Sequence, residues 1–127
     1  MTEPKIVGTG ITDFGRFPEL TEEALAQSAI LEALRDAGLQ IAEIDAFYCG
    51  NAIGASLPGQ RALRELHTGG NAVYNIDNAC SSGATALNAA LSALRSGQYE
   101  TVLVFGMDQL SSLGGGPLPL SRNDWNN

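Results

Sequence analysis

The sequence predicts an α/β domain in which a mixed, mostly parallel sheet is flanked by helices. Segments with strand and helix patterns alternate along the chain in the order β-α-β-α-β-α-β. This alternation favours βαβ units with right-handed crossovers. The run from Thr101 to Gly106 (TVLVFG) is almost continuously apolar, which is typical of a strand covered on both faces. A chain of 127 residues is long enough to build one hydrophobic core.

The first half of the chain predicts two strands with a helix between them. Lys5–Gly10 (KIVGTG) and Ile44–Gly50 (IDAFYCG) combine apolar, β-branched and aromatic residues and end on glycine, as strands do. Between them, Thr21 stands at a helix N-cap position and is followed by two glutamates, and Gly38 follows the last apolar turn. Apolar residues recur every four positions inside these bounds, so this helix has one buried face.

The second half predicts a short helix over Gly59–Leu66, a strand over Ala72–Ile76 and a longer helix within Cys80–Ser96. Between Gly83 and Leu94 the longer helix carries no charged side chain. A helix without a charged face is typical of a buried position. Its many alanines also keep it thin, so that neighbouring elements can approach on several sides.

The composition excludes several classes of function. The chain has 14 acidic and 7 basic side chains, and its net charge of -7 argues against nucleic-acid binding or docking on an anionic membrane. Apolar runs are too short to span a bilayer, and the N-terminus lacks a secretory pattern, so we expect a cytoplasmic protein. Cys49, Cys80 and the single histidine, His67, have no metal-ligand spacing, so we expect two free thiols and no metal site.

Two common site motifs are absent from the sequence. Gly8 and Gly10 begin a G-x-G-x-x-G pattern, but Asp13 stands where the third glycine is needed, and a loop delays the following helix. No G-x-S-x-G motif of a serine hydrolase occurs. His67 lies at the end of a short helical segment, and we interpret it as a surface or helix-terminal histidine.

Cys80 is the candidate catalytic residue. It lies between a predicted strand and a predicted helix, in a run of small residues, DNACSSG. A thiol at a helix N-terminus faces unpaired backbone N–H groups and the positive end of the helix dipole, which favour its thiolate. Such a thiolate can attack an acyl carbonyl, and the same N–H groups can bind the oxyanion. The residues alone leave a second interpretation open, in which Cys80 is a small apolar residue that begins a buried helix. Cys49, inside a strand, is predicted to be a core residue.

Four stretches of the chain resemble the N-terminal half of a thiolase, most closely the bacterial members related to the sterol-carrier-protein thiolases. They are KIVGTGITDFGRF (Lys5–Phe17), FYCGNAIG (Phe47–Gly54), DNACSSGATAL (Asp77–Leu87) and GMDQLS (Gly106–Ser111). Ketosynthases share a similar A-C-S-S core, and the first and last stretches favour thiolases. The resemblance covers about residues 4–112, an incomplete N-terminal domain, and residues 113–127 would begin a loop region or form a disordered tail.

The resemblance implies acyl transfer with acyl-CoA or 3-oxoacyl-CoA thioesters, with coenzyme A as a substrate and no permanently bound cofactor. Cys80 would be acylated, and its backbone N–H would contribute to an oxyanion hole. The family fold has five layers made from two similar halves, and the helix after Cys80 would lie in the central layer. The strand Ala72–Ile76 would pair across a homodimer interface, and some relatives work with a small OB-fold partner protein.

The chain departs from the family pattern because it lacks everything that the second half supplies. In the family that half provides a histidine that activates the nucleophile, a second catalytic cysteine, and the residue that orients a water at another oxyanion hole. Neither His67 nor Cys49 matches these positions. The last strand of the first sheet is also missing, and the CoA-contacting residues are not identified. We therefore expect the 127 residues to be the nucleophile-bearing half, as a fragment or one part of a split protein, and to be inactive alone.

Two alternatives remain open. The chain could be a non-catalytic assembly subunit with a thiolase-like fold. It could also resemble the aldolases that act on steroid side-chain CoA esters, although those relatives generally use other residues in place of the nucleophilic cysteine, so Cys80 argues against this.

Overall fold

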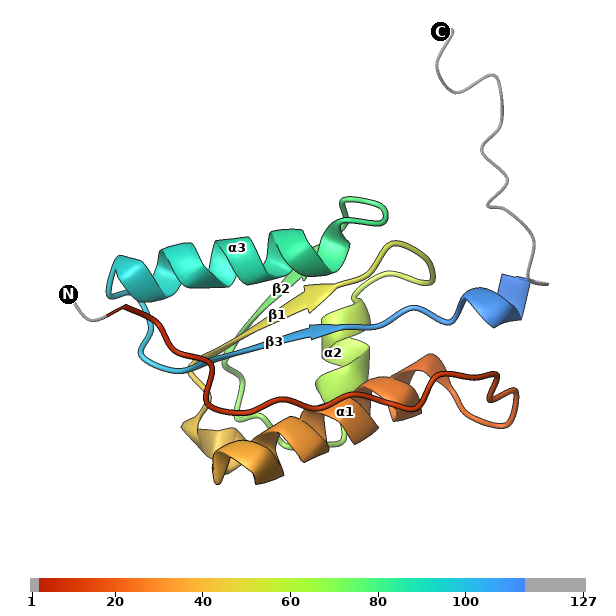
Figure 1. Cartoon of the computed structure of the whole chain (residues 1–127), viewed down its shortest axis with the longest axis horizontal. Coiled ribbons are helices and arrows are strands. Elements are labelled where there is room, and N and C mark those ends of the chain that lie inside the picture. The colour runs from red at the N-terminus through yellow and green to blue at the C-terminus, as the bar shows by residue number, and fades with distance from the viewer. Residues whose placement is uncertain (1–2, 114–127) are drawn as a thin grey trace, which may run out of the picture.

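A three-stranded parallel sheet forms the centre of the molecule (Figure 1). The computed structural model describes residues 3–113. The spatial order of the strands is β2-β1-β3, with bounds β1 Ala46–Gly50, β2 Ala72–Ile76 and β3 Val102–Gly106. Gly50 at the end of β1 lies opposite Ile76 on one side and Gly106 on the other, so the carboxyl ends of the three strands lie together at one edge of the sheet.

Helices cover both faces of this sheet. In Figure 1, α3 lies on one face, and α1 and α2 lie on the other. The helix bounds are α1 Glu22–Ala37, α2 Pro58–Leu63 and α3 Ser82–Arg95, with short 3-10 turns at Ile41–Glu43 and Leu110–Leu113. The structure therefore confirms the α/β class and the parallel sheet. No helix in the described part of the chain is long and apolar enough to cross a membrane.

The predicted ends of the first helix are confirmed. The Oγ1 atom of Thr21 accepts a hydrogen bond of 3.1 Å from the backbone N–H of Ala24. Gly38 follows the helix with a φ of 70°, in the left-handed region where glycine is favoured, and its N–H bonds to the carbonyl groups of the last turn. The sequence contained both signals because helix capping depends on residues next to each other in the chain.

The core consists of two layers separated by β1, whose five residues are all buried. Phe47 and Cys49 point toward the α1 and α2 side and pack with residues such as Ile30. Ala46 and Tyr48 point toward α3, where its alanines pack against the sheet. This alternation follows from the two-residue period of a strand, and it puts Cys49 deep inside the layer that faces away from α3.

The predicted first strand, Lys5–Gly10, is wrong, because this segment pairs with no strand in the described structure. In Figure 1 it runs along α1, separated from β3. Its glycines let it pack against the helix: a Cβ on Gly8 would lie 2.5 Å from the carbonyl oxygen of Ala33, and one on Gly10 would lie 2.1 Å from that of Ala29. A strand needs a neighbouring strand to complete its hydrogen-bond ladder, and this segment lies against a helix, whose backbone groups are already paired.

One burial prediction also needs correction. β3 is an edge strand, and the side chains of Leu103 and Phe105 on one of its faces are buried more completely than those on the other. The strand covered on both faces is β1 instead. The uncharged helix α3 is buried on the side that faces the sheet, and Leu87 on its flank is 42% exposed. This exposure agrees with the expectation that a second half of the fold would cover the helix.

Candidate active site

The turn between β2 and α3 places Cys80 at the surface, directly before the N-terminus of α3. β2 ends at Ile76 and α3 begins at Ser82, so five residues make the connection. Cys80 is exposed and is a free thiol. The residue before it, Ala79, has a φ of 48°, a left-handed conformation that costs a non-glycine residue about 1–3 kcal/mol. A small side chain limits that cost, and the conformation turns the chain sharply at the cysteine.

Backbone and side-chain hydrogen bonds hold this turn closed. The N–H of Ser81 donates to the carbonyl of Asn78 at 3.0 Å, and the N–H of Ser82 donates to that of Ala79 at 3.1 Å. The carboxylate of Asp77 accepts a 3.0 Å hydrogen bond from the N–H of Ala79. Both the N–H and the carbonyl group of Ala79 are therefore hydrogen-bonded, and these bonds hold the turn in which Cys80 lies.

The carboxyl end of β1 lies against the start of α3. A Cβ added to Gly50 would lie 2.7 Å from the carbonyl carbon of Ser82 and 2.8 Å from the nitrogen of Gly83. These are backbone atoms of the first helical turn, so they cannot move aside by rotating a side chain. Glycine at this position lets the helix that carries the candidate nucleophile approach the sheet closely.

The first amides of α3 are available for another partner. Among the described residues, the backbone N–H groups of Cys80, Gly83 and Ala84 donate no hydrogen bond within the chain. The first N–H that is paired in the helical pattern is that of Thr85, which donates to the carbonyl of Ser81 at 2.9 Å. Unpaired amides at a helix N-terminus favour an anion, either a thiolate or the oxyanion of a tetrahedral intermediate.

The second cysteine has an opposite environment. Cys49 is fully buried in β1, as the sequence predicts. Burial, with smaller contributions from the carboxylates of Glu22 and Asp108, raises the pKa of the Cys49 thiol from 9.0 to about 12. It is therefore protonated at neutral pH and unsuited to nucleophilic attack.

The structure does not bring the single histidine to the cysteine. His67 follows α2 in a turn with a φ of 55°, its side chain is exposed, and no hydrogen bond or ion pair in the described structure joins it to Cys80. Within residues 3–113 no group of three or more histidine, cysteine, aspartate or glutamate side chains could hold a metal ion. The site therefore contains a candidate nucleophile and candidate oxyanion donors, but no neighbouring general base.

A buried polar cluster at the same edge of the sheet was not predicted. Asn51, immediately after β1, is 8% exposed, and its amide nitrogen lies within hydrogen-bond distance of Glu22 (2.7 Å), Asp108 (3.1 Å) and the carbonyl of Met107. Burial raises the pKa of Glu22, although the hydrogen bond from Asn51 and the charge of Arg61 oppose the shift. The available signal in the sequence was a polar residue within two positions of the end of each of two apolar strands, Asn51 after β1 and Asp108 after β3.

This cluster also holds the loop after β1. The carboxylate of Asp108 accepts hydrogen bonds from the backbone N–H groups of Ala52 (3.2 Å) and Ile53 (2.9 Å). Two of the stretches quoted for the family resemblance, Phe47–Gly54 and Gly106–Ser111, therefore meet here. These hydrogen bonds join the two stretches to each other, so we interpret the contact as structural.

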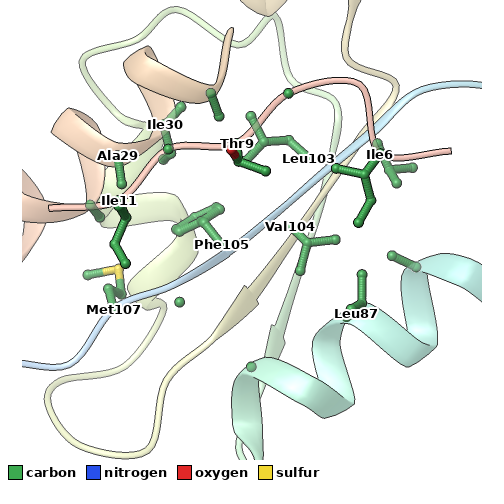
Figure 2. Close-up of a pocket in the computed structure, with 18 of the residues that line it drawn as sticks. Ile6, Thr9, Ile11, Ala29, Ile30, Leu87, Leu103, Val104, Phe105 and Met107 are labelled. Carbon is green, nitrogen blue, oxygen red and sulfur yellow. The ribbon is translucent and has the colours of Figure 1, made fainter. Parts of the chain in front are cut away.

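A groove of about 550 Å³ lies beside the outer edge of β3 (Figure 2). Its walls are the segment from Pro4 to Thr12, α1 and α3, and its lining is predominantly apolar. Figure 2 shows Ile6 and Ile11 on the N-terminal segment, Leu87 on α3, and the side chains of β3 between them. Ile6 and Ile11 are 78% and 66% exposed, so the segment and β3 both present surface without a packing partner in the described structure.

Fold and site together define a parallel α/β domain with an exposed cysteine at a strand-to-helix turn. Residues 5–116 match the family model described as the N-terminal domain of thiolase, and the chain therefore belongs to the thiolase family. The sequence is 31% identical to an acetyl-CoA acetyltransferase of Methanocaldococcus jannaschii, an alignment that covers 89% of this chain and 30% of that protein. It is 34% identical to human sterol carrier protein 2 over 86% of this chain and 21% of that protein.

Solved structures agree on the fold. The 3-oxoacyl-[acyl-carrier-protein] synthase III of Aquifex aeolicus superposes with a TM-score of 0.71 at 28% identity, over 83% of this chain and 35% of that chain. An Ltp2-ChsH2(DUF35) aldolase superposes with a TM-score of 0.63 over 74% of this chain and 24% of that chain, but at 22% identity it supports the fold alone. The chain thus spans about a third or less of the length of each of these proteins.

Proposed function

We propose that this chain carries the nucleophile of a thiolase-type acyltransferase that acts on acyl-CoA or 3-oxoacyl-CoA thioesters. The thiolate of Cys80 attacks the thioester carbonyl carbon, and a new carbon–sulfur bond forms to Cys80. The bond to the CoA sulfur then breaks, and CoA leaves as a thiolate. The product is an acyl-cysteine, and the backbone N–H of Cys80 stabilises the oxyanion between the two steps.

The observation that carries this proposal is the contrast between the two cysteines. Cys80 is exposed at a helix N-terminus where nearby amides are unpaired, whereas Cys49 is buried and protonated. The exposure of the Cys80 side chain supports this interpretation over the alternative in which Cys80 is a small apolar residue that begins a buried helix. Family membership supports the same chemistry, since acetyl-CoA acetyltransferases are among the relatives.

The complete active site needs polypeptide that the described residues do not contain. An efficient cysteine nucleophile requires a general base within hydrogen-bond reach, and no described residue takes that role. We propose that the base and the second catalytic cysteine come from a second, similar half, as the family resemblance implies. The exposed outer face of α3 supports this, because its uncharged surface would be covered by such a half.

The groove beside β3 suggests how that half attaches to this one. No backbone hydrogen bond links residues 4–12 to β3 in the described structure, and β3 has no strand partner on its outer side there. An apolar extended segment placed there would pair with β3 and would supply the missing last strand. Covering an open edge in this way also removes an aggregation hazard.

The outer edge of β2 is the proposed homodimer contact. β2 is the other edge strand of the sheet, and Tyr74 on it is 37% exposed. Tyr74 stacks on Tyr48 with ring centroids 4.7 Å apart, and its hydroxyl is 2.7 Å from that of Tyr99. These contacts stiffen the edge that a second copy would meet. A small partner protein, expected to have an OB fold, is proposed from the family resemblance.

Selective modification of Cys80 tests the proposal. The folded chain is incubated with iodoacetamide, and separately with acetyl-CoA, near pH 8, and the modified cysteine is mapped by mass spectrometry. The pKa of Cys49, raised by burial to about 12, keeps its thiol protonated at this pH, and its side chain is buried. We therefore expect Cys80 to be labelled selectively over Cys49.

Two variants complete the test. Cys80→Ser should abolish both labels and retain the fold, and Cys49→Ser should leave the labelling of Cys80 unchanged. Iodoacetamide labelling without acetylation, even after the second half is supplied, would favour the assembly-subunit alternative. An aldolase would cleave its CoA ester without consuming free CoA, which product analysis distinguishes from thiolysis.

A further inference from the structure

The side-chain amide of Asn51 faces more hydrogen-bond acceptors than it has hydrogens. Its nitrogen carries two hydrogens, and three oxygen atoms lie within hydrogen-bond distance of it. One belongs to the carboxylate of Glu22 (2.7 Å), one to the carboxylate of Asp108 (3.1 Å) and one to the backbone carbonyl of Met107. Asn51 itself is 8% exposed. When both carboxylates are ionised, they therefore compete for the same buried hydrogens.

Both carboxylates also contact the loop that follows β1. Asp108 accepts hydrogen bonds from the backbone N–H groups of Ala52 and Ile53. Gly54 has a φ of 122°, in the region that favours glycine, and a Cβ added to it would lie 3.1 Å from the Oε2 atom of Glu22. The loop is thus bonded to one acidic side chain and packed against the other, so a change in the charge of either one acts on the loop.

Arg61 on α2 brings a positive charge to the same loop. Its guanidinium group donates 3.0 Å hydrogen bonds to the carbonyl groups of Ala55 and Ser56. It also lies 3.9 Å from the carboxylate of Glu22 and is paired with that of Glu23. The charged and titratable side chains that face Glu22 from the elements around it are Asp108 after β3, Arg61 on α2, Glu23 on α1 and Cys49 on β1. Among these groups, only Arg61 is positively charged.

Protonation of Glu22 relieves the competition for the amide of Asn51. Burial raises the pKa of Glu22 above its usual value of 4.5, and the hydrogen bond from Asn51 and the charge of Arg61 oppose this shift only in part. The negative charge of Asp108 raises the pKa further. A neutral carboxyl group accepts hydrogen bonds more weakly than a carboxylate, so the hydrogens of Asn51 are then left to the other two acceptors. The carboxylate that holds the loop is thereby bound more firmly.

We propose that Glu22, Asn51, Asp108 and Arg61 form a proton-dependent clasp on residues 52–56, which protonation of Glu22 closes and ionisation of Glu22 loosens. The loop and residues 75–77 line a common cavity of about 220 Å³, so the clasp controls one wall of a cavity that reaches the start of the turn carrying Cys80. The inference does not depend on the reaction of Cys80, because every contact in the clasp lies outside that turn.

The closed loop holds the proton of Glu22 more tightly than an open loop, in which the carboxyl group is solvated. Closure is therefore fully favoured below pH 4.5 and is weakened as the pH rises through the folded-state pKa of Glu22. Because a single proton is involved, the equilibrium between the open and closed loop changes by at most about tenfold per pH unit.

Amide hydrogen exchange of the full chain, followed by NMR and corrected for the intrinsic rate at each pH, tests the clasp. The protection of the Ala52 and Ile53 amides should fall as the pH rises from 4.5, with no more than about a tenfold loss per pH unit. Glu22→Gln keeps the shape of the side chain without its charge and should retain high protection at every pH. Glu23→Gln is the matched control, because Glu23 is the next residue of α1 and also pairs with Arg61 but does not bond to Asn51. This variant should retain the pH dependence.

Several outcomes overturn the clasp. One is a pH-independent protection of the two loop amides in the wild type, and another is the same pH dependence in Glu22→Gln. Loss of the pH dependence in Glu23→Gln as well would show a general effect of charge at the start of α1. Protection of the loop amides equal to that of the Tyr48 amide in β1 would show that they exchange only when the whole domain unfolds. If Glu22→Gln does not fold, the side-chain carboxyl carbon of Glu22 is titrated by NMR in the wild type, and a midpoint different from that of the loop amides refutes the proposal.

Discussion

Replacement of Gly50 by alanine tests whether the close approach of β1 and α3 positions the nucleophile turn. The added Cβ would lie 2.7 Å from the carbonyl carbon of Ser82, and ordinary van der Waals contact begins near 3.4 Å. The first turn of α3 would therefore have to retreat by about 0.7 Å, the difference between these distances. The atoms that clash belong to the backbone, so the displacement moves the helix start and with it the turn that carries Cys80.

We expect Gly50→Ala to lower the free energy of unfolding by about 1–3 kcal/mol, the usual cost of overpacking a core. For a chain of this size that corresponds to a fall in Tm of roughly 4–12 °C. Thermal unfolding followed by circular dichroism measures this change. The reaction of Cys80 with iodoacetamide should also slow, because the amides at the start of α3 move relative to the sulfur.

Gly106→Ala is the matched control. Gly106 lies opposite Gly50 in the register between β1 and β3, and a Cβ there would meet nothing closer than the carbonyl oxygen of Gly50 at 3.7 Å. This variant should stay within about 1 kcal/mol of the wild type, since replacing an unstrained glycine by alanine changes mainly the unfolded chain. Equal stabilities and equal Cys80 reaction rates in the two variants would refute the packing argument.

Two further predictions concern α1. Thr21→Ala removes the N-cap and should lower the free energy of unfolding by about 1 kcal/mol, measured by urea denaturation, whereas no change would show that the observed bond to Ala24 contributes nothing. The folded-state pKa of Glu22 lies above 4.5, so folding favours its protonated form. Its contribution to stability is therefore full below pH 4.5 and is lost as the pH rises through the folded value. The stability of the wild type relative to Glu22→Gln should accordingly fall as the pH rises across that range, and a pH-independent difference would contradict this.

Local signals in the sequence predicted most of the elements correctly. The strand Ala72–Ile76 has the predicted bounds, and the first helix lies between its predicted caps, Thr21 and Gly38. The failures have a common cause. The segment Lys5–Gly10 has the composition of a strand, but pairing depends on a neighbour that this structure does not contain. The uncharged face of α3 predicts a partner surface, and the described residues cover only one side of the helix.

Some features of the candidate site could be predicted from the sequence, and others could not. The sequence showed a cysteine between a strand and a helix, because both elements are read from adjacent residues. It did not show that Gly50 lies under the helix start, or that Asn51 joins Glu22 and Asp108 across more than 50 residues of chain. These contacts depend on the parallel register, which brings the carboxyl ends of β1 and β3 together.

By itself, the sequence determined the α/β class, the caps of the first helix and the position of Cys80 at a helix start, because each depends on short-range patterns of side chains. Only the tertiary structure decided the environment of each cysteine. Both lie beside apolar segments, but the alternation of β1 points Cys49 into the core, where burial raises its pKa to about 12. The left-handed turn at Ala79 instead leaves Cys80 at the surface, beside amides that the fold does not use.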